Sequence, residues 1–285
     1  MTKENEKFKR NVGDILRMGI DVETELEFFI SKYYIQKQRN KFQTKLYMPE
    51  KSKIKQARNK LFRILESCEL CPRRCKVNRL KGEKGFCNAG SKLKIAASMP
   101  HFYEEPPISG KYGAGNIFFS YCNMKCVYCQ NYKISQLHNG KEITTEELAD
   151  IMIDLQDRKV HNIGFVSPAH FLPWIVESIE IATENGLMIP LIYNTNGYER
   201  IETLKLIEGI FDIYLPDIRY SSNRLAEKYS GTANYVEYNQ KAIKEMFRQV
   251  GNPIFNKDGT IKKLSLIHIS EPTRPLYISY AVFCL

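Results

Sequence analysis

Cysteines are grouped along this chain in a way that limits how two of its loops can fold. Seven of the eight cysteines lie between Cys68 and Cys129, in two groups with short CxxC-type spacings. Short spacings of this kind are typical of thiols that bind a metal or form disulfides. The chain starts MTKENEKFKR, without the apolar core of a secretory signal, and no apolar run approaches the roughly 20 residues of a membrane span. We therefore expect a cytoplasmic protein, away from membranes, whose reduced thiols bind metal.

From Asn116 onward, short apolar segments alternate with amphipathic ones. The apolar segments predict strands at 116–121, 161–166, 188–193 and 211–215. The amphipathic segments predict helices at about 172–185, 199–208 and 234–249. Another helix is predicted to start at Thr144, because Thr144 and Glu147 have the spacing of a capping box. The alternation predicts an α/β fold with a parallel sheet and crossover helices.

The segment before this sheet is basic and helical in pattern. Apolar spacing predicts helices over about 22–47 and 50–67, followed by a loop to Gly90 and a strand over Leu93–Ser98. Residues 1–67 carry 16 Lys and Arg against 9 Asp and Glu, so they hold +7 of the net charge of +10. No nucleic-acid-binding pattern accompanies these charges, which favours a solvated basic helical face over a nucleic-acid surface.

The second cysteine group follows an apolar strand directly. Residues 120–130 read SYCNMKCVYCQ, so Cys122, Cys126 and Cys129 form C-x3-C-x2-C. Three thiolates on one short loop can each bind one iron of a cubane, and the remaining iron keeps open coordination positions. A zinc knuckle or three incidental core thiols is the alternative, but zinc sites favour four ligands, commonly in C-x2-C pairs.

This motif, with Tyr128 before its third cysteine, resembles the cluster motif of the radical S-adenosylmethionine (SAM) superfamily. The resemblance covers about residues 116–250 and is nearest to activating enzymes of the pyruvate formate-lyase type, in a poorly characterised branch with an N-terminal four-cysteine motif. It implies a partial (β/α) barrel, a [4Fe-4S] cluster on the three cysteines, and SAM bound at the unique iron. It further implies an electron donor such as flavodoxin or ferredoxin and, as protein substrate, a glycyl radical enzyme.

Two later segments resemble those that lie along SAM in activating enzymes. YNTNG at 193–197 resembles D-T-N-G, and YLPDIRY at 214–220 resembles M-L-D-L-K. The resemblance assigns four residues to SAM or a nearby monovalent cation: Tyr128, Thr195, Asn196 and Asp217. A plain turn at Asn196 and Gly197 is the alternative.

The chain departs from the family pattern at two places. Asn194 replaces an acidic residue, so a cation site would be altered, and SPAH at 167–170 replaces the G-G-E segment that contacts the SAM amino group. His170 or the backbone at Ser167 and Ala169 could take over that contact. A loop histidine is more often solvated, and we expect this of His170.

The first cysteine group has four members in the spacing C-x2-C-x3-C-x11-C: Cys68, Cys71, Cys75 and Cys87. Four thiolates on one loop can saturate a tetrahedral ion, and Gly82 and Gly85 supply the bends that such a loop needs. Zinc and an auxiliary iron–sulfur cluster both fit this pattern. Unbound thiols or disulfides are the alternative.

The end of the chain has a different character. Residues 264–274 read LSLIHISEPTR and resemble the translation of a transposase adaptor used for sequencing libraries, with a genuine strand LSLIHIS as the alternative. On the adaptor interpretation, native sequence ends near Lys263, the barrel is truncated and Cys284 has no function. Four parts are then expected: a helical segment at 1–67, a four-cysteine metal loop at 68–90, an incomplete radical SAM barrel at 91–263, and a non-native tail at 264–285.

Several functions fit these features. We favour reductive SAM cleavage to a 5′-deoxyadenosyl radical that abstracts hydrogen and activates a glycyl radical enzyme; a radical SAM enzyme acting on a small molecule or another protein residue comes next. A non-catalytic metal or electron-transfer protein and a nucleic-acid-binding zinc protein belong to other classes. Release of 5′-deoxyadenosine from SAM separates the enzymes from both.

Overall fold

The computed structural model describes residues 50–269 and 280–283, with the backbone alone from residue 265 onward. The helix expected over about 22–47, and Cys284, lie outside the described residues. No described helix is both long and apolar enough to cross a bilayer.

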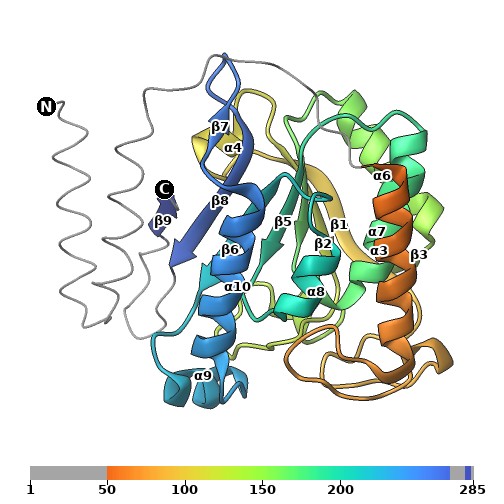
Figure 1. Ribbon diagram of the computed structural model, residues 1–285, viewed down its shortest axis with the longest axis vertical. Coiled ribbons are helices and arrows are strands. Elements are labelled where there is room, and N and C mark those ends of the chain that lie inside the picture. Colours follow the sequence, from red (N-terminus) through yellow and green to blue (C-terminus); the bar gives the residue numbers. More distant parts are fainter. Residues whose placement is uncertain (1–49, 270–279, 284–285) are drawn as a thin grey trace, which may run out of the picture. The chain divides into compact units, whose positions relative to one another are not determined.

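A mixed sheet with parallel strands at its centre organises the described residues (Figure 1). The parallel strands, in spatial order, are β2 (Ala114–Phe119), β4 (Ile163–Val166), β5 (Leu191–Thr195), β6 (Ile213–Ile218) and β8 (Ile261–Ile269). The antiparallel strands are β1 (Leu93–His101) and β3 (Lys141–Ile143) beyond β2, with β7 (Ile254–Phe255) and β9 (Tyr280–Phe283) beside β8. Each parallel strand lies beside the parallel strand before it in the sequence, an order compatible with a partial (β/α) barrel.

The predicted strands are confirmed, with bounds displaced by up to three residues. β5 begins only after Pro190, which has no N–H to donate to a neighbouring strand. The N–H of Leu191 donates to the Asp212 carboxylate at 2.9 Å, which fixes the starts of β5 and β6 beside each other. The three-residue strand β3 was not predicted, because its pairing with β1 comes from contacts distant in sequence.

The predicted helices are confirmed as well. They are α3 (Lys51–Ile64), α6 (Thr145–Asp157), α7 (Leu172–Glu184), α8 (Ile201–Leu206) and α10 (Tyr235–Val250). A 3-10 turn, Leu65–Ser67, continues α3 to the predicted end at residue 67. The short helices α4 (Pro106–Ser109), α5 (Tyr132–Ser135) and α9 (Asn223–Ser230) were not predicted, because one or two turns give too little periodicity to detect.

The capping box at the start of α6 is formed as predicted. The Thr144 hydroxyl accepts from the Glu147 N–H at 3.1 Å, and the Glu147 carboxylate accepts from the Thr144 N–H at 2.8 Å. We expect Thr144→Ala to lower the free energy of unfolding by about 1 kcal/mol, because an N-terminal N–H loses its partner. Urea titration measures the change. The neighbouring Thr145→Ala is the control, and an equal loss in both variants would contradict the capping role.

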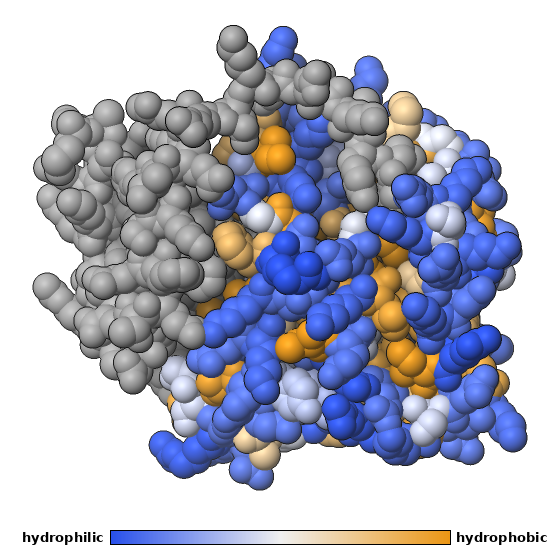
Figure 2. Space-filling view, viewed as in Figure 1, coloured by the Kyte–Doolittle hydropathy of each residue, from blue (hydrophilic) through white to orange (hydrophobic). Residues whose placement is uncertain are grey.

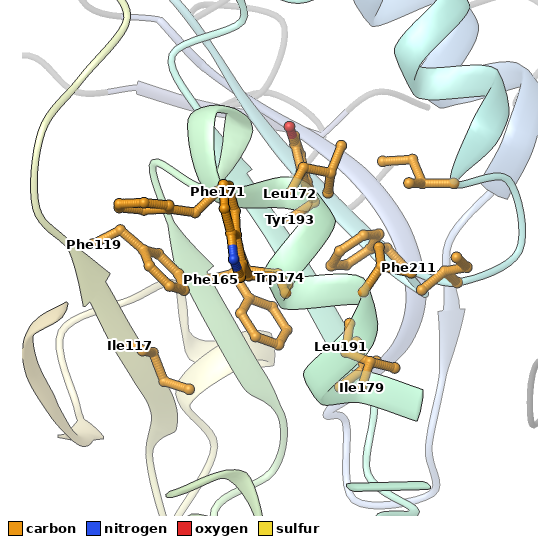
Figure 3. Packing of buried hydrophobic residues seen from close by; sticks show 14 of the residues in the cluster. Ile117, Phe119, Phe165, Phe171, Leu172, Trp174, Ile179, Leu191, Tyr193 and Phe211 are labelled. Carbon is orange, nitrogen blue, oxygen red and sulfur yellow. The ribbon is translucent and has the colours of Figure 1, made fainter. Parts of the chain in front are cut away.

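Aromatic side chains fill the main core between the sheet and the helices (Figure 3). The Phe119 and Phe165 rings stack with centroids 6.3 Å apart, and Phe211 meets Phe165 edge-on at 5.8 Å. Trp174 of α7 meets Phe171 edge-on at 5.7 Å. Such offset and edge-on pairs stabilise beyond the area they bury, so this core holds the parallel strands in a defined register.

The two faces of the sheet carry different clusters. Tyr193 and Tyr214 lie in the main core, to which α3, α6, α7, α8 and α10 all contribute, whereas Ile192 and Ile213 lie in a second buried cluster with Ile108 of α4. This follows from the alternation of side chains along a strand. The outer side of the helices meets water, and the described surface in this view is largely hydrophilic with smaller hydrophobic patches (Figure 2).

The adaptor-like segment takes part in the sheet. Its first residues form the second half of β8, which runs parallel to β6 with Leu264 opposite Ile213 and His268 opposite Asp217. A strand here is the alternative that the sequence left open. The foreign origin of residues 264–285 stays a prediction.

Candidate functional site

The parallel strands end together at one edge of the sheet. Phe118, Val166, Asn194 and Leu215 occupy one row across β2, β4, β5 and β6. The segments that follow this row are therefore neighbours, and they include every residue that the resemblance assigns to SAM or the cluster. Ligands in parallel α/β sheets collect at this edge.

Residues 120–131, here called the triad loop, follow β2 and bring three cysteines together. Cys126 is 6% exposed, while Cys122 and Cys129 are half-buried. All three lie in or against one buried cluster with four larger side chains, Met124, Tyr198, Tyr220 and Tyr235. Tyr121 and Lys125 have positive φ values of 72° and 57°, which turn the loop back on itself. The sequence-predicted triad is thus one compact group beside an aromatic wall.

Polar groups donate to the sulfur atoms of this triad. Cys122 Sγ accepts from the Met124 N–H at 3.4 Å and from Asn196 Nδ2 at 3.7 Å, and Cys129 Sγ accepts from the Ser135 hydroxyl at 3.3 Å. Burial raises the pKa of Cys122, while backbone N–H donors and the Arg219 guanidinium oppose the rise. Donors to sulfur stabilise a metal-bound thiolate, so the donor set fits three ligands of an iron–sulfur cluster. Within the described residues, no group of three or more His, Cys, Asp or Glu side chains already has a geometry that could hold a metal ion.

The YNTNG turn after β5 is docked on the triad loop. Asn196, 6% exposed, donates from Nδ2 to Asn123 Oδ1 at 2.7 Å, and its Oδ1 accepts from the Tyr198 N–H at 3.0 Å. The Thr195 hydroxyl donates to Glu199 Oε1 at 2.5 Å and accepts from the Gly197 N–H at 3.2 Å. Asn196 and Gly197 do form a turn, and that turn also reaches the cysteine site.

Asp217 lies at the end of β6 and forms an ion pair with Arg219. Its backbone carbonyl accepts from Tyr235 Oη at 3.1 Å and Asn239 Nδ2 at 2.8 Å. The Arg219 charge also lowers the pKa of Cys122, which indicates that the guanidinium lies near the triad. Sequence reasoning gave Arg219 no role. Strand alternation could not mark it, because β6 ends at Ile218 and Arg219 lies just beyond the strand.

Tyr128 lies on the outer part of the triad loop. Its ring is 37% exposed and meets Tyr220 edge-on, with centroids 6.1 Å apart. A contact between Tyr128 and SAM stays a prediction.

The expectation of a solvated His170 was wrong. His170 is 3% exposed, and its Nε2 lies 2.7 Å from the Ser120 carbonyl oxygen at the start of the triad loop. Burial lowers the pKa of His170 to about 3, so the ring is neutral. The 3-10 turn Ala169–Phe171 folds it inward, a path that sequence pattern does not reveal. His170 supports the triad loop rather than facing solvent.

Glu199 gives this region a pH-dependent stability. It is 1% exposed, and burial raises its pKa from the usual 4.5 to about 7. The folded state then keeps a proton that the unfolded state releases, so this stabilisation is full below pH 4.5 and is lost as pH rises from 4.5 through 7. We expect Glu199→Gln to be more stable than the unmodified protein at pH 8, by up to about 3 kcal/mol, with little difference at pH 5.

Urea titrations at pH 5, 6.5 and 8 check this expectation. Asp212 and His170 also titrate, but they change both proteins alike and cancel in the difference. A difference that stays constant across the three pH values would contradict it.

The four cysteines of the first group line one cavity, together with side chains that include Arg73, Arg79 and His170. Arg79, 1% exposed, donates to the His170 carbonyl at 2.6 Å and to the Gly90 carbonyl at 3.0 Å. A buried arginine of this kind holds the loop against the sheet. Sequence reasoning missed it, since nothing in the sequence marks one arginine of a basic loop as buried.

Comparisons with known proteins place the chain in a family. The family model described as the Radical SAM superfamily matches residues 116–259. The uncharacterized protein MJ0674 of Methanocaldococcus jannaschii is 32% identical over 183 residues, which cover 61% of this chain and 52% of that protein. The uncharacterized protein MJ0808 of the same organism is 28% identical over 157 residues, covering 49% of this chain and 46% of that protein. The chain thus spans about half the length of these relatives.

The matched residues include the three parts of the site described above. They contain the cysteine triad after β2, the turn after β5 and the charged pair at the end of β6. The family normally uses a [4Fe-4S] cluster and SAM, which agrees with the donor set of the triad. The chain belongs to the radical SAM superfamily.

Proposed function

We propose that this protein cleaves SAM reductively at a [4Fe-4S] cluster held by Cys122, Cys126 and Cys129, supplying a 5′-deoxyadenosyl radical that abstracts hydrogen from a substrate. The observation that carries the proposal is the triad loop at the carboxyl edge of the parallel sheet, with the turn after β5 docked on it and the Asp217–Arg219 ion pair at the end of β6. Membership of the superfamily supports the same chemistry.

The chain's own residues would hold the cluster and SAM in place. Asn196 binds the triad loop through Asn123, and Ser135 and the Met124 N–H donate to cysteine sulfurs. The charges of Asp217 and Arg219 lie beside the triad and could bind the amino and carboxylate groups of SAM. In this proposal Thr195, Asn196, Asp217 and Tyr128 contact SAM or a nearby monovalent cation.

Aromatic side chains would exclude water on one side of the site. Tyr198, Tyr220 and Tyr235 are each 3% exposed or less, and Tyr220 meets Tyr235 edge-on at 5.4 Å. Their hydroxyl groups are occupied, since Tyr198 donates to Asn234 at 2.8 Å and Tyr235 to the Asn196 carbonyl at 2.9 Å. A dry, preformed wall suits a reactive carbon radical, because it prevents side reactions with solvent.

The substrate we propose is a glycine of a glycyl radical enzyme, with flavodoxin or ferredoxin as the electron donor. This part of the proposal rests on the resemblance to activating enzymes alone. The alternative within the same chemistry is a small molecule or another protein residue.

The test has two stages. First, anaerobically reconstituted protein is reduced and mixed with SAM, and 5′-deoxyadenosine is measured; the proposal requires its release. Second, candidate glycyl radical enzymes carrying α-deuterated glycine are added. Deuterium in 5′-deoxyadenosine supports the glycyl substrate. Release of unlabelled 5′-deoxyadenosine with every candidate favours the alternative substrates, and no release with any reductant contradicts the function itself.

A further inference from the structure

Residues 68–90, here called the four-cysteine loop, follow a path fixed by backbone hydrogen bonds. Cys68 N–H donates to the Val77 carbonyl at 2.9 Å, and Lys76 N–H donates to the Cys68 carbonyl at 3.1 Å. Arg74, Lys76 and Asn88 all have positive φ, from 42° to 62°, although none is glycine. Three such residues within one loop cost free energy, and this conformation persists only where other interactions compensate.

The loop turns its thiols toward one cavity. Cys68 and Cys87 are 8% and 9% exposed, Cys71 and Cys75 are half-buried, and all four line the same cavity. A Cβ at Gly85 would lie 2.7 Å from Cys75 Sγ, so only glycine lets this thiol take its place. The Phe86 N–H then donates to Cys75 Sγ at 3.4 Å.

The chemical state of these thiols points to a ligand. None of the seven described cysteines forms a disulfide. Four thiols that line one cavity are the number and kind of ligands that a thiophilic metal takes, and they lose their protons when it binds.

Arg73 connects this loop to the triad loop. Its Nε donates to the Asn123 carbonyl at 3.0 Å, next to Cys122, and its guanidinium carbon lies 3.5 Å from the centroid of the Phe86 ring. The same guanidinium donates to the carbonyls of Ser230 at 2.9 Å and Gly231 at 2.5 Å, at the end of α9. Arg73 lies between Cys71 and Cys75 in the sequence. The positions of these two cysteines therefore determine where the Arg73 side chain can reach.

We propose that Cys68, Cys71, Cys75 and Cys87 bind a second metal through their thiolates, and that the bound metal holds Arg73 against the triad loop. The site lies outside residues 116–259, which match the superfamily. Metal binding by these four cysteines is independent of the proposed SAM chemistry. The role of Arg73 in positioning the triad loop concerns that chemistry and rests on the proposed function.

Metal analysis tests the site independently of SAM. A variant with Cys122, Cys126 and Cys129 all replaced by alanine is prepared anaerobically with zinc, or with iron and sulfide. We expect this triad variant to retain metal. Adding Cys71→Ser and Cys75→Ser to it should remove the metal, whereas adding Cys284→Ser, the control, should not. Bound zinc without sulfide would identify a single metal ion at the four cysteines, and bound iron together with sulfide would identify a cluster. Loss of all bound metal from the triad variant, while it still folds by circular dichroism, overturns the proposal.

A second measurement covers the case in which these variants do not fold. The unmodified protein is treated with iodoacetamide, and each cysteine is mapped by mass spectrometry before and after a chelator. We expect the four thiols to be alkylated only after metal removal. Alkylation at the same rate in both samples, or a disulfide within the loop, overturns the proposal.

The coupling is tested with Arg73→Gln and a matched control, Arg74→Gln, whose side chain is exposed. Hydrogen exchange is measured at the amides of Met124, Val127 and Cys129, together with the electron paramagnetic resonance spectrum of the reduced triad cluster. We expect Arg73→Gln to exchange faster and alter the spectrum while keeping the second metal, and Arg74→Gln to match the unmodified protein. Identical exchange and spectra in all three proteins would refute the positioning role.

Discussion

Cys126→Ala is expected to abolish SAM cleavage while leaving the protein folded. Cys126 is the most buried member of the triad, and its replacement leaves two thiols where the proposed cluster needs three. Release of 5′-deoxyadenosine should fall to the level of a reaction without protein. Removing one buried sulfur costs only about 1 kcal/mol of stability, so the loss is not due to unfolding.

The control for Cys126→Ala is Cys284→Ala, which should keep full cleavage activity. Iron and sulfide analysis and the visible spectrum accompany the assay on both anaerobic proteins. If Cys126→Ala retained both the cluster spectrum and cleavage, the assignment of the triad would be wrong.

Gly197→Ala is expected to lower the free energy of unfolding by about 3 kcal/mol. Gly197 has a φ of +74°, and an added Cβ would lie 2.5 Å from the Asp217 carbonyl oxygen and 2.1 Å from Asn239 Nδ2. The backbone strain and the overpacking each cost on the order of 1 to 3 kcal/mol. The turn after β5 must then move away from the end of β6, so we also expect the KM for SAM to rise.

Gly186→Ala separates the two causes. Gly186 has a φ of +94°, but no atom lies within 4 Å of the position that its Cβ would take. This variant should lose only about 1 kcal/mol, from strain alone. Urea titrations of both variants measure the difference, and equal losses would show that the close approach at Gly197 does not matter.

The fold was largely predictable because its signals are local. Apolar runs at the central strands and the T-x-x-E spacing at Thr144 act over a few residues, and the strands and the capping box are present as predicted. β3 and α9 escaped prediction because short elements depend on partners elsewhere in the chain. The helix expected over about 22–47 lies outside the described residues and stays a prediction.

The residues of the candidate site likewise differ in whether a local sequence pattern reveals them. Spacing alone marked Cys122, Cys126 and Cys129 as candidate ligands, because ligands of one centre on one loop must be close in sequence. Arg219 and His170 are different, since their roles come from the direction and burial that packing imposes. No local pattern distinguishes a histidine supporting Ser120 from a solvated one.

The sequence by itself determined that seven cysteines gather in two loops and that the central strands are parallel, because short-range spacing encodes both features. Only the tertiary structure decided that the two loops meet, through Arg73 and the Asn123 carbonyl, 50 residues apart in the chain. A hydrogen bond from a side chain to a distant backbone carbonyl can be made to any residue type, and it therefore leaves no mark in the sequence.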